Sequence, residues 1–264
     1  MDKALLVCSK STKRYLEKYE RVMIIDKPPT KAILDIAQSE DRVVAIGGGA
    51  VIDSAKIISK TPITCYPTTA AGSSDTKHSV YWDGERKMNF TSHVPNIVII
   101  NNDAIKTLPK PIIYQTRCDL ISHCIDSLHS KKADGLSINL CTTALQKITE
   151  SKAVEDLIAA GRLGGKAIQI TTTNLLHALS YPLTGRYDIS HGIALSYLIS
   201  KLTTLFNTFY DIPNILGSSY MKYTAPVFNM KKIDWDWVID EAYTYNKIED
   251  FSGNVNKEIL RELL

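Results

Sequence analysis

Asp119 and His123 are a carboxylate and an imidazole four residues apart in the apolar stretch "CDLISHCIDSLHS". Residues four apart lie on the same face of an α-helix, so both side chains are expected to point the same way. A buried carboxylate is costly unless something compensates its charge. A metal ion and a plain Asp–His hydrogen bond both meet that need, and this stretch alone does not decide between them.

His177 and His191 form a second pair, fourteen residues apart, in "NLLHALSYPLTGRYDISHG". Pro182 and Gly185 lie between them and predict a break, so the expected order is helix, reversing loop and helix. His177 is then near the end of one helix and His191 at the start of the next, and such a corner can bring both rings to one point. Together with the first pair they suit a divalent transition metal; unrelated core and capping histidines are the alternative.

Three consecutive glycines in "VVAIGGGAVIDSAK" lie where a buried strand is expected to turn into a helix. Glycine lets a ligand approach the main chain, and the N–H groups at a helix start favour a phosphate. The spacing differs from the G-x-G-x-x-G dinucleotide signature. A second small-residue loop, "YPTTAAGSSDT" at 66–76, follows the next strand. Two such loops favour a pyrophosphate site, with plain tight turns and surface loops as the alternative.

Strands and helices must position these residues. Short apolar strands are expected at 3–9, 21–26, 42–49, 63–69 and 96–102, with helices at 12–19, 29–38 and 50–60 between them. This alternation predicts a mostly parallel sheet covered by helices. From about residue 105 longer helical segments take over, at 109–130, 136–150, 154–180, 191–207 and 232–250. We therefore expect an α/β N-terminal domain at 1–106 and an all-helical domain at 107–264.

The composition excludes several classes of protein. The 264 residues are 44% hydrophobic and 22% charged, the range of ordinary globular proteins. A net charge of +3 with scattered Lys and Arg gives no argument for nucleic acid, and no apolar run is long enough to span a membrane. Five cysteines, an odd number in mostly apolar sequence, indicate reduced thiols, so we expect a cytoplasmic protein.

Five pieces of the chain, in this order, resemble the iron-containing (group III) alcohol dehydrogenases, relatives of glycerol dehydrogenase and dehydroquinate synthase. They are "GGGAVIDSAK", "PTTAAGSSD", "VPNIVIINNDAIKTLP", "CDLISHCID" and "HALSYPLTGRYDISHG". The resemblance implies a dehydroquinate synthase-like fold, with a dinucleotide-binding α/β domain and a helical metal-binding domain. It also implies NAD(P)-dependent interconversion of an alcohol and its aldehyde or ketone.

The family's site residues are carried over by position. Its metal ligands fall on Asp119, His123, His177 and His191, which would hold one Fe(II) or Zn(II) ion. Its pyrophosphate contacts fall on Gly48, Gly49 and Ala50. Asp53, in the helix that follows, is also expected to bind the cofactor. Its nicotinamide-side loop falls on Thr68, Thr69 and Ser74, with Ser79 and Lys87 as looser matches.

Ser9 stands where NAD-preferring members of the family often place an aspartate. A carboxylate there would accept hydrogen bonds from the ribose 2′-hydroxyl and repel a 2′-phosphate. With serine in its place and Lys10, Lys13 and Arg14 close by, we expect NADP(H) to be preferred or at least accepted beside NAD(H). An exposed basic helix start that binds nothing is the alternative.

The chain also departs from the family pattern, since family members are usually a good third longer. Tyr181 replaces a histidine that many members place near the nicotinamide, so it is a candidate hydroxyl donor or a packing residue. Arg186, in the loop between His177 and His191, is a candidate contact for an anionic group on the substrate. The alternative is that Arg186 points to solvent or pairs with Asp188.

The favoured function is a metal-dependent NAD(P)-linked oxidoreductase acting on a small alcohol or aldehyde. A non-redox sugar-phosphate cyclase like dehydroquinate synthase and a catalytically silent family member are the alternatives. The expected partners are a small-molecule substrate and, at most, a second copy of the chain in a homodimer.

Overall fold

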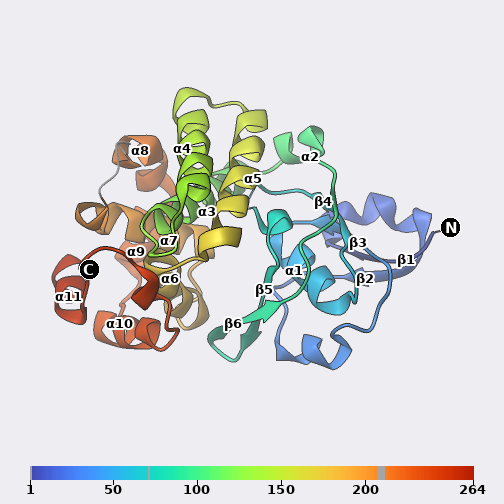
Figure 1. The fold of residues 1–264 in the computed structure, drawn as a ribbon, viewed down its shortest axis with the longest axis horizontal. Helices are drawn as coiled ribbons and strands as arrows, with labels where there is room; N and C mark the ends of the chain where they lie inside the picture. Colours follow the sequence, from blue (N-terminus) through green and yellow to red (C-terminus); the bar gives the residue numbers. More distant parts are fainter. Residues whose placement is uncertain (1, 71, 207–211) are drawn as a thin grey trace. The chain divides into compact units, whose positions relative to one another are not determined.

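A computed structural model of the chain describes residues 2–70, 72–206 and 212–264 (Figure 1). The chain divides into two compact units, Met1–Leu108 and Pro109–Leu264. The first is α/β and the second is helical in its described part, which is the fold class that the sequence predicts.

The first unit is built on a five-stranded parallel sheet in the order β2-β1-β3-β4-β7. The strands are β1 (Asp2–Cys8), β2 (Tyr19–Ile24), β3 (Val43–Gly47), β4 (Thr64–Pro67) and β7 (Ile97–Val98). In the register, Cys8 pairs with Ile46 and Gly47 pairs with Pro67. The residues that follow β1, β3 and β4 therefore leave the sheet at the same edge, and these are Ser9, Gly48 and Thr68.

Helix α1 (Gly49–Ile58) is enclosed on several sides, which explains its apolar sequence. It packs against β3 and against β5 (His78–Asp83), which forms an antiparallel hairpin with β6 (Arg86–Thr91). Every residue from Val51 to Ile58 is buried. With Leu5, Ala45 and Cys65 from the sheet, this helix forms the main core of the unit.

Three elements of the first unit differ in type or length from the sequence prediction. The helices expected at 12–19 and 29–38 are 3₁₀-helices, η1 (Lys10–Lys18) and η2 (Lys31–Ile36). The strand expected at 96–102 is only two residues long, because the chain then turns into the short helix α2 (Asn102–Lys106) capped by the Asn101 side chain. A single turn, η3 (Ser73–Asp75), lies in the loop after β4.

Helix α3 (Lys110–Leu128) is the centre of the second unit and packs against α4, α5, α6, α7 and α8. Its residues Leu120, Ile121, Cys124 and Ile125 have no exposed surface. The elements that follow it are α4 (Gly135–Glu150), α5 (Val154–Thr171), α6 (Leu175–Gly185), α7 (His191–Lys201), η4 (Thr203–Leu205), α8 (Ile212–Tyr223), α9 (Ala225–Met230), α10 (Trp235–Tyr243), η5 (Ile248–Asp250) and α11 (Lys257–Leu263).

Two helix boundaries differ from the sequence prediction. The segment expected as one helix at 154–180 breaks at residues 172–174, where Thr172 has a φ of 63° and Asn174 caps α6. Pro182 does not break α6 but lies inside it, and the helix continues to Gly185. The helix expected at 191–207 ends at Lys201, and Asn207 lies outside the described residues.

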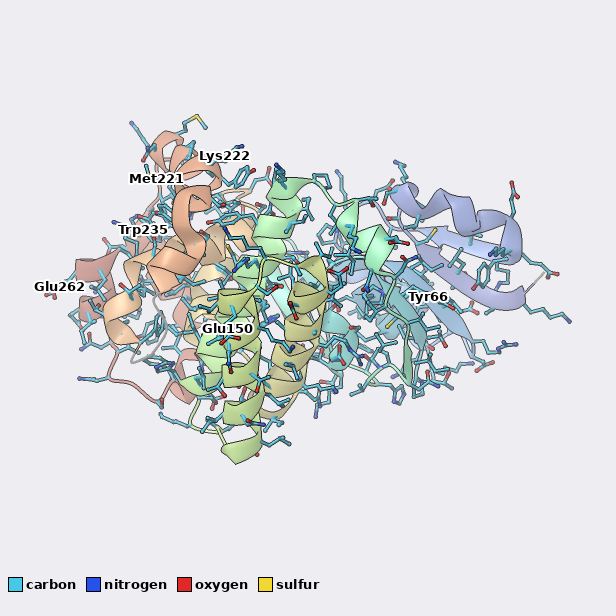
Figure 2. All side chains as sticks on the ribbon, turned by 90° about the horizontal axis from the view of Figure 1, so that it is seen from above. Tyr66, Glu150, Met221, Lys222, Trp235 and Glu262 are labelled. Carbon is cyan, nitrogen blue, oxygen red and sulfur yellow. The ribbon has the colours of Figure 1, made fainter. Side chains whose placement is uncertain are left out.

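All five cysteines are buried and none is in a disulfide. Among the described residues, no helix is both long and apolar enough to cross a membrane. The most exposed apolar side chains include Met221 on α8, 67% exposed, which Figure 2 shows projecting from the end of that helix beside Lys222.

Candidate metal and dinucleotide sites

Helix α3 presents Asp119 and His123 on one face, as the spacing predicts. The Nε2 atom of His123 lies 3.6 Å from Oδ1 of Asp119. Both side chains are largely buried, with 15% of Asp119 and 10% of His123 exposed.

The two later histidines come to the same carboxylate. The Nε2 atoms of His177 and His191 each lie 3.6 Å from Oδ1 of Asp119. His191 is the first residue of α7, but His177 lies in the first turn of α6, so the expected position near a helix end is wrong. The ring of His177 stacks on His123 with centroids 4.8 Å apart and meets His191 at 5.3 Å.

These side chains have the geometry of a cation site. One ligand atom each from Asp119, His177 and His191 lies within 4.8 Å of the other two, and His123 reaches the same carboxylate oxygen. Within the described part of the chain, Oδ1 of Asp119 and Nε2 of His177 are buried without a hydrogen-bond partner. Buried polar atoms are rarely left so, and 3.6 Å is too long for a hydrogen bond. A divalent ion among these atoms would satisfy them, so the residues present fit the metal that the resemblance implies.

Asp126 is a residue of the site that the sequence reasoning missed. Its Oδ2 lies 2.8 Å from Nδ1 of His177, and its carboxylate also accepts backbone N–H groups of Asn174, Leu176 and His177. Because Nδ1 donates to this carboxylate, Nε2 is the ring nitrogen of His177 that faces Asp119 and is available to a cation. The signal was present in "CDLISHCID", where Asp126 is one helical turn after His123.

The site strongly favours positive charge. Burial raises the pKa of the Asp119 carboxyl, but the three imidazoles around it offset that effect and hold its pKa well below its usual range. Burial lowers the pKa of His177, but the carboxylates of Asp119 and Asp126 outweigh burial and raise it to about 9. A cation bound here would therefore be held by charge as well as by ligand geometry.

Close approach between α7 and α3 sets the position of His191. A Cβ atom at Gly192 would lie 2.5 Å from the backbone oxygen of Gln115, so only glycine fits there without movement. Gly192 follows His191 directly, and Gln115 is one turn before Asp119 on α3. The contact thus holds the first turn of α7 against the helix that carries the carboxylate.

Tyr181 and Arg186 occupy different environments. Tyr181 is 5% exposed, and its ring centroid is 6.2 Å from His191 and 6.4 Å from His177. Arg186 is exposed, and its guanidinium lies 4.2 Å above the ring of Trp237 on α10. Tyr181 is therefore adjacent to the histidine cluster, whereas Arg186 stacks on a tryptophan. The expected contact between Arg186 and the substrate stays a prediction.

In the first unit, the glycine turn and the second loop come together. Gly48 is the N-cap of α1, so the N–H groups of Gly49 and Ala50 belong to the unpaired first turn of a helix. A Cβ atom at Gly48 would lie 3.2 Å from Thr69, and the N–H of Thr68 donates to the carbonyl of Gly47. The residues of both predicted cofactor loops are thus in direct contact.

Lys56 holds the second loop, at 66–76, through hydrogen bonds to its backbone. This lysine is 2% exposed and donates hydrogen bonds to the carbonyls of Ser73 (3.0 Å), Thr76 (3.2 Å) and His78. Asp53, expected as a cofactor contact, is buried and forms an ion pair with Lys56 at 3.4 Å. Burial raises the pKa of Asp53 and lowers that of Lys56. The pair therefore has a structural role that the sequence reasoning did not predict.

The remaining cofactor candidates spread along the loop and hairpin. Ser74 donates to the carboxylate of Asp75 at 3.0 Å, and Ser79 is fully buried with its hydroxyl 3.4 Å from that of Ser92. Lys87 lies on β6, opposite Trp82. Ser9 forms hydroxyl hydrogen bonds with Ser11 and Thr12 after β1.

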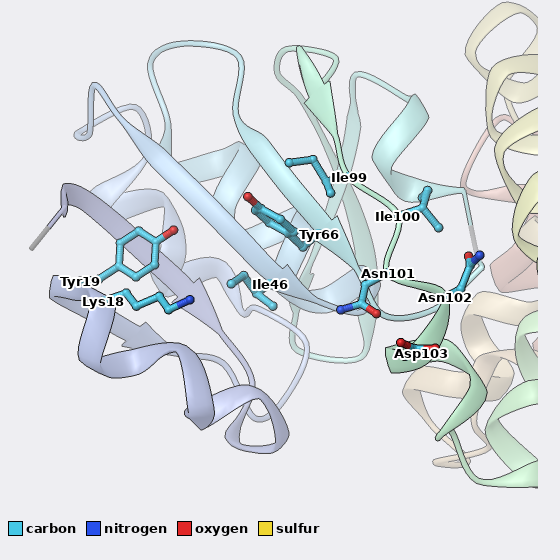
Figure 3. Close-up of a pocket in the computed structure, with 9 residues that line it drawn as sticks. All are labelled: Lys18, Tyr19, Ile46, Tyr66, Ile99, Ile100, Asn101, Asn102 and Asp103. Atoms are coloured by element: carbon cyan, nitrogen blue, oxygen red, sulfur yellow. The ribbon is translucent and has the colours of Figure 1, made fainter.

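A cavity of about 510 Å³ lies on the sheet face that carries Ile46 and extends from the start of β2 to the segment after β7 (Figure 3). Figure 3 shows Tyr19 and Lys18 at one end and Asn101 and Asp103 near the other. The remaining lining residues are Ile46, Tyr66, Ile99, Ile100 and Asn102. None of the predicted cofactor residues lines this cavity. Its aromatic and branched side chains come from β2, β3, β4 and the segment after β7, so no local motif indicates it.

Comparison with known proteins connects this geometry to a family. Residues 113–212 match the model of the Fe-containing alcohol dehydrogenase family, C-terminal. This stretch contains all four candidate ligands. Over these residues the helical unit is similar to the Fe-containing alcohol dehydrogenase family. The resemblance inferred from the motifs is thereby confirmed.

Relatives along a larger part of the chain carry names of the same kind. The chain is 26% identical over 238 residues to a 4-hydroxybutyrate dehydrogenase of Clostridium kluyveri, covering 75% of this chain and 62% of the relative. It is 26% identical to a 1,3-propanediol dehydrogenase of Citrobacter freundii over 60% of this chain and 46% of that protein. The chain thus spans about half to two thirds of these relatives' length.

Solved structures show the same fold. An iron-containing alcohol dehydrogenase superposes with a TM-score of 0.81 at 21% identity, covering 99% of this chain and 90% of that one. One from Thermotoga maritima gives 0.78 at 22% identity, covering 99% and 90%. A 1,3-propanediol oxidoreductase gives 0.79 at 20% identity, covering 99% and 91%.

Proposed function

We propose that this protein is a metal-dependent, NAD(P)-linked oxidoreductase that interconverts a small alcohol and its aldehyde or ketone. The observation that carries the proposal is the convergence of His123, His177 and His191 on the carboxylate of Asp119. Relatives named for propanediol, propanol and hydroxybutyrate support the substrate class.

Asp119, His123, His177 and His191 would hold one divalent ion, Fe(II) or Zn(II). Bound there, such an ion supplies Lewis-acid polarisation of a substrate oxygen. Asp126 orients His177, and the buried ring of Tyr181 closes one side of the cluster. Of the two roles expected for Tyr181, its ring contacts with His177 and His191 support packing, and its hydroxyl stays a candidate donor.

In the first unit, Gly48, Gly49 and Ala50 would receive the pyrophosphate of the dinucleotide at the start of α1. Thr68, Thr69 and Ser74 add hydroxyl groups beside them. The cavity between Tyr19 and Asn101 has apolar and aromatic walls suited to the planar base of the nucleotide. Asp53 acts through Lys56, which holds the loop, rather than as a direct contact.

The cofactor choice is less simple than the sequence suggested. Lys10, expected to favour a 2′-phosphate, forms an ion pair with Asp26. Lys13 and Arg14 have side chains outside the described set. The argument for acceptance of NADP(H) beside NAD(H) therefore depends on Ser9 alone. A serine there puts no carboxylate next to the ribose that would repel a 2′-phosphate.

The decisive experiment is an assay of purified protein with a panel of short aldehydes and both reduced cofactors. Loss of absorbance at 340 nm that depends on the aldehyde and the metal, and that disappears in His191→Ala, supports the proposal. Turnover of a sugar phosphate without net change at 340 nm would instead show the cyclase alternative. Stoichiometric metal and nucleotide binding without turnover would show a silent family member.

A further inference from the structure

Lys247 is a half-buried lysine that precedes the turn η5 and lies near Tyr181, whose ring borders the histidine cluster. Its Nζ donates to Oγ1 of Thr173 at 3.0 Å and lies 3.5 Å from the carbonyl oxygen of the same residue. It also lies 5.9 Å from the ring centroid of Tyr181. Within the described residues no carboxylate forms an ion pair with it, and its polar partners are the two oxygens of Thr173.

Two short routes connect this ammonium group to the candidate metal ligands. The ring of Tyr181 lies about 6 Å from Nζ of Lys247 and about 6 Å from the rings of His191 and His177. Thr173 is followed directly by Asn174, whose backbone N–H donates to the carboxylate that holds His177. Lys247 is thus anchored to the segment that positions one ligand and to the ring that borders two.

In the part of the chain that the structure describes, the charges around the cluster include no carboxylate that would neutralise the ammonium group of Lys247. Asp119 and Asp126 are the two carboxylates in contact with the histidines, and together they match a divalent ion. The charge of a half-buried ammonium group then has no counter-charge among the described residues, and a partly desolvated charge is stabilised when one is supplied. The ammonium group of Lys247 and the hydroxyl of Thr173 can both donate hydrogen bonds to a ligand group that carries one negative charge.

The histidine cluster is open at one edge. The side chain of His191 is 26% exposed, compared with 3% for His177. A ligand reaching the cluster therefore arrives near His191, the histidine whose ring lies at a 30° interplanar angle to that of Tyr181. The ring of Tyr181 lies 6.2 Å from that of His191 and 5.9 Å from the ammonium group of Lys247.

We propose that Lys247 binds a carboxylate on the substrate, so that the substrate class is a short ω-hydroxy carboxylic acid and its aldehyde. This proposal rests on the proposed function and adds the substrate's charged end to it. Lys247 is then a specificity-determining residue, and Tyr181 packs between it and the metal ligands without contacting the substrate. Arg186, the cation expected from the sequence, is instead stacked on Trp237.

The test compares ω-oxo acids of three to five carbons with neutral aldehydes of the same lengths, using wild type, Lys247→Met, Lys247→Arg and the control Lys257→Met. We expect Lys247→Met to lower kcat/KM for the best acid by roughly ten- to a hundredfold, mainly through KM, and for the neutral aldehyde by less than about threefold. Lys247→Arg should restore most of the loss, and Lys257→Met should match wild type. An equal loss on both substrates, or no loss on either, overturns the proposal.

A binding measurement separates this proposal from the proposed function. Calorimetric titration of metal-loaded protein with 4-hydroxybutanoate, and with butan-1-ol for comparison, needs no turnover. If the wild type binds the acid and Lys247→Met binds it at least tenfold more weakly, the Lys247 site stands even when no reduced cofactor is oxidised. If wild type and Lys247→Met bind all the acids equally, the site is wrong even when the protein is an active dehydrogenase.

Discussion

Asp126 and His177 are joined by a contact of 2.8 Å between Oδ2 and Nδ1, and both side chains are almost completely buried. The carboxylate also accepts N–H groups at the start of α6, so it fixes the helix and the ring together. We expect Asp126→Asn to weaken divalent metal binding by about ten- to a hundredfold, because the amide cannot hold the imidazole in the same tautomer. Competition with a chromogenic chelator measures this.

Asp234→Asn is the matched control for that prediction. Asp234 likewise accepts a backbone N–H at a helix start, that of Trp237, but it does not contact a histidine. It should leave metal affinity unchanged. Equal metal affinity for Asp126→Asn and wild type would show that the contact does not orient the ligand.

The ligand set itself makes a second prediction. Wild-type protein purified without chelator should carry about one divalent ion per chain by its four-ligand count, and His191→Ala and Asp119→Ala should lose most of it. Removal of the ion should lower the thermal midpoint of wild type and have little effect on the variants, because the ion stabilises only a chain that binds it. Elemental analysis and thermal unfolding with and without chelator test both parts. Full metal content and activity in His191→Ala would contradict the assignment.

Lys56 gives a stability prediction for the first unit. Lys56→Met leaves Asp53 buried without its partner and removes three hydrogen bonds to the loop at 73–78. Breaking a buried pair in this way typically costs about 3–5 kcal/mol of unfolding free energy. The control is Lys60→Met, because Lys60 pairs with Asp41 at the surface, where such a pair contributes roughly 0–1 kcal/mol. Urea unfolding of both variants should separate them clearly; similar losses would mean that Lys56 does not hold the loop.

Asp26 gives a prediction about cofactor choice. It pairs with Lys10, so Asp26→Asn frees a cation next to Ser9. We expect this variant to raise kcat/KM for NADPH relative to NADH by several-fold, since the freed charge attracts the 2′-phosphate. Steady-state kinetics with both cofactors measure the ratio. A ratio equal to that of wild type would place the 2′ position away from Lys10.

Cys118 makes stability depend on pH at the alkaline end. Burial raises the pKa of this thiol to about 12, from an ordinary value near 9. The unfolded chain therefore loses this proton above pH 9 while the folded chain keeps it, so stability present below pH 9 is lost as the pH rises toward 12. The slope is at most about 1.4 kcal/mol per pH unit. Between pH 9 and 10.5, wild type should lose unfolding free energy faster than Cys118→Ala, whereas parallel slopes would contradict the pKa.

The spacing of residues was enough to predict much of this molecule, because local periodicity determines which side chains share a face. Asp119 and His123 lie together for that reason alone, and the parallel sheet follows from alternating strands and helices. The position of His177 differs from the prediction because the start of α6 is held by the Asp126 carboxylate, which is distant in sequence and accepts N–H groups of Asn174, Leu176 and His177. The roles of Lys56 and Lys247 were not predicted for a similar reason, since the carbonyls that Lys56 binds and the Thr173 oxygens that Lys247 binds are distant in sequence, and backbone oxygens carry no motif. Pro182 was read as a helix breaker, but it is accommodated inside α6.

The contact of Gly192 with the backbone at Gln115 has a consequence for how the histidine cluster can change. Attraction between charges tolerates small displacements, but two backbones in contact act as a mechanical stop. The absence of a Cβ atom at Gly192 therefore sets the separation of α3 and α7. That separation limits the size of ion that the four side chains can surround. Enlarging that one position is a way to alter the selectivity of the cluster among ions of different radius while every ligand is kept.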